Sequence, residues 1–154
     1  MIEGVRVIDF HGHVGSNDIM GMADDPDVML RAMDACGIDV SCLFNIYYPS
    51  GTIGNDMTAR FVAQHPDRFV GFAYVSPLAP AEDMVAELER AIDTLKLVAI
   101  KLYPPFVPWP MNEPVWDPIY EFANDRGLVI IHHTGAEYQP FPKYLADVAP
   151  RSVS

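Results

Sequence analysis

Basic residues are scarce in this sequence. Ten lysines and arginines face 21 aspartates and glutamates, which gives the chain a formal net charge of -11 at pH 7. Proteins that bind nucleic acid or anionic membrane surfaces place lysine and arginine against phosphate groups. We therefore expect neither nucleic acid nor membrane as a partner.

Long apolar runs and cysteines are also lacking. No segment approaches the roughly 20 apolar residues of a membrane span, and the N-terminal residues lack the basic and apolar pattern of a signal peptide. The two cysteines, Cys36 and Cys42, are separated by five residues, which fits neither a CxxC motif nor a disulfide framework. We expect a cytoplasmic protein with two reduced thiols.

The composition that remains is that of a globular domain. Hydrophobic residues make up 50% of the 154-residue chain and charged residues 20%, so we expect one core and a single domain, residues 1–154. Short β-branched apolar runs alternate with longer segments of helical periodicity, which indicates repeated βα units. The expected strands are 5–11, 39–45, 69–75, 97–103 and 128–133, and the expected helices are 27–36, 55–64, 80–95 and 113–126, with a last one starting near Phe141.

Two parallel α/β architectures fit this alternation: an open doubly wound sheet and an arc of a (β/α)8 barrel. A doubly wound sheet ordinarily has a GxGxxG turn after its first strand, whereas the turn at 11–15 reads HGHVG. We therefore predict the N-terminal portion, about five βα units, of a TIM (β/α)8 barrel. The barrel would be incomplete, because a whole one needs about 250 residues.

The sequence also predicts how the helices end and pack. Gly37 and Gly127 stand where a left-handed C-terminal cap is expected. In the helix 80–95, an apolar stripe at helical spacing is opposed by charged residues. The stripe is Met84, Val85, Leu88, Ile92 and Leu95, and the opposing residues are Glu82, Glu87, Glu89 and Arg90. We interpret this stripe as packing and not as a binding site.

Two histidines end the first expected strand. His11 and His13 are two residues apart, so in extended backbone both side chains leave the strand on the same face. Barrel enzymes carry their catalytic groups at the carboxyl ends of the strands, and neutral imidazole is a common ligand of divalent metals. The pair predicts part of a metal site, although two adjacent loop histidines can also occur without function.

Two more histidines end the fifth expected strand. Histidine is costly to bury beside an apolar strand unless it is paired or bound to metal, so one of His132 and His133 is expected to be a ligand. Alternation cannot choose between them, because both faces of this strand are apolar. The other histidine would then lie behind the ligand or point toward the helices.

Five segments together resemble one known family. They are VIDFHGH at 7–13, DRFVGF at 67–72, AIKLYP at 99–104, WDPIY at 116–120 and GLVIIHHTG at 127–135. In this order they resemble the amidohydrolase superfamily, specifically the amidohydrolase-related branch that includes aminocarboxymuconate-semialdehyde decarboxylase. The resemblance implies that His11, His13 and His133 bind a divalent metal ion, with zinc expected. It also implies a histidine after strand six and an aspartate after strand eight, for which this chain has no place.

The resemblance bears on Lys101 as well. In some branches of the superfamily a lysine at the end of strand four is carbamylated and bridges two metals, but in this branch we favour a structural role or contact with a substrate carboxylate. Asn45, Tyr47, Tyr103 and Trp109 follow strands two and four, where barrel loops meet the substrate. Asn45, Tyr47, Lys101 and Tyr103 are therefore candidate substrate-binding residues, with loop packing as the alternative for the residues after the strands.

The expected function is that of a truncated metal-dependent hydrolase whose parent cleaves an amide, ester or lactone-like bond of a small molecule with metal-activated water. Two alternatives stay open: non-oxidative decarboxylation with the same ligands, and a non-catalytic half-barrel that acts in binding or assembly. We expect the chain alone to be inactive and to self-associate through its unpaired strand edges. We also expect that it ends by truncation of a longer reading frame.

Overall fold

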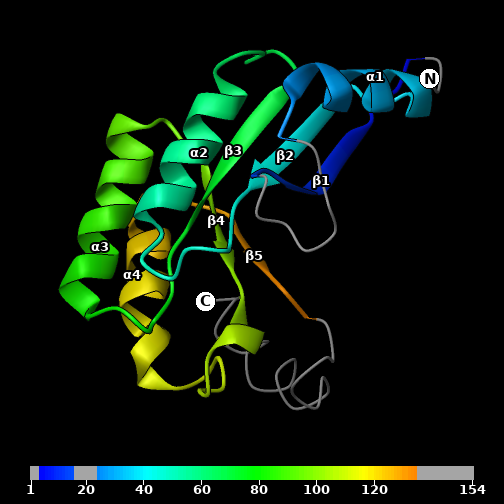
Figure 1. The fold of residues 1–154 in the computed structure, drawn as a ribbon. Helices are drawn as coiled ribbons and strands as arrows, with labels where there is room; N and C mark the ends of the chain where they lie inside the picture. The colour runs from blue at the N-terminus through cyan, green and yellow to red at the C-terminus, as the bar shows by residue number, and fades with distance from the viewer. Residues whose placement is uncertain (1–3, 16–23, 135–154) are drawn as a thin grey trace.

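The computed structural model describes residues 4–15 and 24–134, which form one parallel sheet with helices packed against it (Figure 1). The strands are β1 Ile8–His13, β2 Val40–Phe44, β3 Phe69–Tyr74, β4 Ala99–Leu102 and β5 Ile130–His132. Each strand pairs in parallel with the next one along the chain, in the order β1-β2-β3-β4-β5. A doubly wound sheet would reverse this order partway, so the described strands form an arc of a barrel.

Helices connect the strands close to where the sequence predicts them. They are α1 Pro26–Cys36, α2 Thr52–Val62, α3 Ala81–Glu89 with a π-helical continuation Arg90–Thr94, and α4 Asp117–Arg126. Short 3-10 turns at Pro104–Phe106 and Pro114–Trp116 precede α4, so this helix begins four residues later than expected. Gly37 and Gly127 adopt the predicted left-handed conformation, with φ of 70° and 62°. The helix expected near Phe141 lies outside the described residues.

Successive strand residues pack on opposite sides of the sheet. Ala73 and Ile100 face the outer core, where the sheet meets α3 and α4. Phe44 and Tyr74 face the opposite, inner side, which in a barrel is the interior. Figure 1 shows α2, α3 and α4 together on the outer side of the sheet. Phe44 and Tyr74 are nevertheless buried on the inner side, with 0% and 1% of their surfaces exposed.

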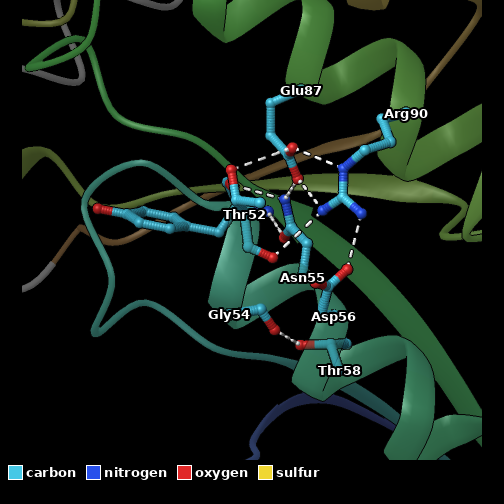
Figure 2. A network of polar contacts seen from close by, with 8 residues as sticks. Thr52, Gly54, Asn55, Asp56, Thr58, Glu87 and Arg90 are labelled. Carbon is cyan, nitrogen blue, oxygen red and sulfur yellow. Dashed lines mark hydrogen bonds and ion pairs between the residues drawn. The ribbon is translucent and has the colours of Figure 1, made fainter.

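The outer side contains a buried charge that the sequence pattern did not predict. Glu87 was expected opposite the packing stripe of its helix, and this prediction is wrong: its side chain is only 7% exposed. Its carboxylate accepts hydrogen bonds from Asn55 Nδ2 at 2.7 Å, from Arg90 Nε at 2.8 Å and from Thr52 Oγ1 at 3.3 Å (Figure 2). Arg90 supplies the neutralising charge that makes this burial tolerable.

Asn55 extends this network to the sheet. Its side-chain amide donates to the carbonyl of Tyr74 at 3.0 Å and accepts from the backbone N–H of Tyr74 at 2.8 Å, so it pairs with the last residue of β3 as another strand would. The network thereby connects α2 and α3 to the carboxyl end of β3. It stabilises the edge of the sheet at which the candidate site lies.

The first strand has a neighbour on one side only among the described strands. As a result, the side chains of Ile8 and Phe10 are 51% and 50% exposed, although both are large and apolar. Within the part of the chain that the structure describes, no helix has the length and hydropathy needed to cross a membrane.

Candidate metal centre

A β-bulge near the end of β1 aims the first histidine into the inner face. Asp9 pairs with Ser41 and Gly12 with Leu43, so β1 contains one more residue than β2 between these two pairs. The extra residue places consecutive side chains on one side of the strand. Accordingly, the ring of Phe10 contacts Phe72 on the inner face, with centroids 5.4 Å apart.

His11 and His13 both reach the same inner-face ring. Their ring centroids lie 5.0 and 4.8 Å from that of Phe44, and 5.4 Å from each other. Glycine fits closely between them: a Cβ on Gly12 would lie 2.5 Å from Leu43 Cδ2 on the outer side, so the buried Leu43 side chain would have to shift. The predicted pair is therefore brought together, and the bulge was the feature that alternation alone did not predict.

The strand register distinguishes the two histidines of β5. Ile131 packs with the inner-face cluster and Ile130 with the outer core, so His133 is on the inner side and His132 on the helix side. The ring of His133 lies 6.4 Å from that of His11. The ring of His132 instead lies 6.2 Å from Tyr120 of α4. Burial, with a smaller effect of the nearby lysine charge, lowers the pKa of His132 to about 4.

The inner-face histidines fit part of a metal site. Imidazole nitrogens bind zinc at about 2.0–2.1 Å, so two rings on one tetrahedral ion have centres roughly 5–6 Å apart. The separation of His11 from His13 falls in this range, and that of His11 from His133 is slightly larger. Within the described ranges, no three His, Cys, Asp or Glu side chains are close enough to enclose an ion as they stand. Burial lowers the pKa of His11, which favours the neutral form that binds metals.

Lys101 lies on the inner face beside these histidines. Its residue is 0% exposed, and its Nζ is 4.7 Å from the centroid of the Phe44 ring. Among the described residues, Nζ has no hydrogen-bond partner. Burial lowers the pKa of this ammonium group to about 8.

The candidate substrate-binding residues take different positions. The ring of Tyr103 lies 4.2 Å from that of His133, and the ring of Tyr47 lies 6.3 Å from that of His13. Asn45 is fully buried: its amide donates to the carbonyl of Val14 at 2.8 Å and accepts from the N–H of Tyr47 at 3.0 Å. A substrate contact of Asn45 stays a prediction, and in this structure its amide holds the loop that carries Tyr47.

Sequence reasoning missed one residue at the centre of the site. Phe44 contacts both histidines of β1 and lies under the ammonium of Lys101. No motif marks it, and the only available signal was its place near the carboxyl end of a strand. Trp109, also considered in the loop after β4, keeps 37% of its surface exposed.

Comparison with known proteins extends these observations. A family model described as amidohydrolase matches residues 8–151. The 5-carboxyvanillate decarboxylase of Sphingomonas paucimobilis is 19% identical, with a TM-score of 0.72 over 96% of this chain and 61% of that chain. A 4-oxalomesaconate hydratase of Rhodopseudomonas palustris is 21% identical, with a TM-score of 0.66 over 82% of this chain and 52% of that one.

A third solved structure contains a metal. The 5-carboxyvanillate decarboxylase of Novosphingobium aromaticivorans, with bound manganese and a nitrobenzoic acid, is 17% identical and has a TM-score of 0.74 over 97% of this chain and 56% of that one. The chain thus spans between 52% and 61% of the length of these three structures. Their folds confirm the prediction of a partial TIM barrel.

Proposed function

The chain belongs to the amidohydrolase family, and on this premise we propose that it carries the metal-binding part of the active site of a metal-dependent hydrolase. One observation supports the proposal: His11 and His133 come from the two outermost described strands, yet their rings lie 6.4 Å apart, and the ring of His13 lies 5.4 Å from that of His11. Histidines without a shared ligand would have no reason to face the same side of the sheet from strands so far apart.

A divalent ion held by these three histidines would supply Lewis-acid polarisation of a substrate carbonyl and a lowered pKa for bound water. The remaining groups position and enclose the reactants. Tyr103 packs against the ring of His133 and limits its rotation. Phe44 lies beneath both β1 histidines and excludes water from that side of the site. Tyr47 lies near His13, with ring centroids 6.3 Å apart, where it would contact a small-molecule substrate.

Non-oxidative decarboxylation is the second candidate. The inner face is rich in aromatic side chains, which suit a planar aromatic acid, and two of the similar structures are decarboxylases of such an acid. Zinc is the expected ion from the histidine ligands, and manganese is the alternative that the relative with bound manganese suggests.

Metal titration tests the proposal. Calorimetry with zinc and with manganese should give one binding event in the wild-type chain and at least tenfold weaker binding in His11→Ala and His133→Ala. His65→Ala is the matched control, because His65 lies outside the site, 3.8 Å from Asp27. Equal affinities in all four proteins would contradict the proposed ligands.

Substrate assays distinguish the two reactions. Acid release from aryl esters and lactones would support hydrolysis, whereas carbon dioxide release from hydroxybenzoates would support decarboxylation. We expect the 154-residue chain alone to bind metal without measurable turnover, because the groups implied on strands six and eight have no place in it. Turnover by this chain that a chelator abolishes would contradict that expectation.

A further inference from the structure

The inner face contains a cation that the described structure leaves without an anion. Lys101 is fully buried at the carboxyl end of β4, and no described residue accepts a hydrogen bond from its Nζ. The contact with the ring of Phe44 offsets part of the cost of burying this charge. An ammonium group buried without an acceptor is nevertheless expensive, and a protein ordinarily pairs it.

Other charged groups of the described chain do have hydrogen-bond partners. The buried carboxylate of Glu87 receives both Nε and Nη2 of Arg90, at 2.8 and 2.9 Å. The exposed Lys96 donates to the carbonyl of Asp93 at 2.7 Å. The acid on β1, Asp9, accepts from Ser41 Oγ at 3.1 Å and from the N–H of His11 at 3.1 Å, so its carboxylate is already engaged. Of the two buried charged residues in the described part of the chain, Glu87 and Lys101, Lys101 is the one without a hydrogen-bonded partner.

Lys101 lies at the candidate metal site. The Phe44 ring that lies under Nζ also contacts the rings of His11 and His13. A divalent cation on those histidines and the ammonium of Lys101 would repel each other unless an anion were placed near both. An anionic substrate group would serve both cations, and the neighbouring Phe44 and Tyr103 rings suit a planar group attached to it.

We infer that Lys101 anchors the carboxylate of a planar, aryl-type substrate at this site, and that it selects carboxylates over neutral analogues. The inference deepens the proposed function, on which it rests for the location of the reacting centre. Lys101 would position the substrate through an ion pair, leaving the chemistry to the metal side of the site.

Benzoate and benzamide provide the test, because they share shape and differ in charge. Calorimetry on the wild-type chain should show benzoate binding at least tenfold more tightly than benzamide. Lys101→Met should abolish this preference by weakening benzoate alone. Lys96→Met removes the same charge from an exposed site and should keep the preference. Equal binding of the two probes, or no binding of either, by the wild-type chain would overturn the inference.

A chelator separates this test from that of the metal site. The wild-type chain in EDTA and the His133→Ala variant should both still bind benzoate more tightly than benzamide, at least in part, because both retain Lys101. Failure of zinc binding would then contradict the metal proposal alone. Loss of the preference in Lys96→Met as well as in Lys101→Met would indicate a general charge effect and overturn the role of Lys101.

Two further measurements test whether the Lys101 side chain contacts benzoate directly and whether it is carbamylated instead. If Lys101→Met does not fold, Lys101→Gln takes its place in the binding test. In addition, NMR of the wild type labelled with 13Cε-lysine follows the Lys101 signal. Benzoate and not benzamide must shift this signal, and an unshifted signal overturns the inference. A carbamate signal on Lys101 under 13CO2 would likewise overturn the inference.

Discussion

Replacing Arg90 with methionine would remove the guanidinium that neutralises the buried Glu87. Methionine keeps much of the apolar stem of arginine, so the substitution removes charge with little loss of packing. Glu87 would retain its contacts with Asn55 at 2.7 Å and Thr52 at 3.3 Å, but both are neutral donors. The carboxylate would stay buried without a compensating positive charge.

The magnitude follows from the exposure of the two partners. Removing one partner of a fully buried ion pair costs about 3–5 kcal/mol. The side chain of Arg90 is 33% exposed, so water can reach part of the vacated space, and we expect a loss of about 2–3 kcal/mol in the free energy of unfolding. The same arginine forms an outer pair with Asp56, whose side chain is 38% exposed. Asp56→Asn should therefore cost less than about 1 kcal/mol.

Urea unfolding followed by circular dichroism measures both losses, with an unchanged m value as the sign that the native fold is kept. The double variant of Glu87→Gln and Arg90→Met should lose at least about 1 kcal/mol less than the sum of its single variants, because it buries no unpaired charge. This prediction is wrong if the free energy of unfolding of Arg90→Met stays within about 0.5 kcal/mol of the wild-type value, or if the losses of the two single variants simply add. Either result would mean that the buried Glu87 carboxylate does not depend on Arg90 for its neutralisation.

Gly12→Ala should lower the free energy of unfolding by about 1–3 kcal/mol and weaken zinc binding, because its Cβ would overlap Leu43 Cδ2; thermal unfolding at wild-type stability would contradict the bulge geometry. Burial lowers the pKa of Lys101 from 10.5 to about 8. Burying the charged ammonium therefore lowers the free energy of unfolding by about 3 kcal/mol below pH 8, and this loss disappears as the pH rises toward 10.5. Lys101→Met should therefore stabilise the chain at pH 7 and lose that advantage by pH 10, whereas a constant difference would contradict the lowered pKa. The exposed Ile8 and Phe10 should make sedimentation concentration-dependent, less so in Phe10→Ser, and a monomer at every concentration would argue against self-association.

Local patterns were sufficient to predict the elements of the fold. Apolar runs marked all five described strands, and Gly37 and Gly127 marked two helix ends, because strand burial and left-handed caps depend on residues close together in sequence. The order of the strands in the sheet was predicted from the HGHVG turn, which lacks a dinucleotide-binding glycine pattern. Helix starts were less accurate where proline-rich turns replaced the first helical turn, as before α4.

Contacts between residues far apart in the sequence could not be predicted from such local patterns. Glu87 meets Asn55 across 32 positions of sequence, so helical periodicity alone assigned it to the wrong side. The choice between His132 and His133 depended on the pairing of β5 with β4, in which Lys101 is opposite Ile131. The bulge that turns His11 inward likewise exists only through the pairing of two strands. These features require the register of the sheet, which composition and spacing do not contain.

The two buried charges of the described chain, Glu87 and Lys101, differ in what surrounds them, and this difference separates structure from function. Glu87 lies on the helix side, where hydrogen bonds and the guanidinium of Arg90 compensate its burial, so any change there should destabilise the fold. Lys101 lies on the inner side without an acceptor among the described residues, so an apolar replacement should stabilise the fold while removing the attraction for an anion. The ring of Phe44 offsets only part of the cost of burying the Lys101 charge, so we attribute the position of this lysine beside the candidate metal ligands to the anion that it is proposed to bind.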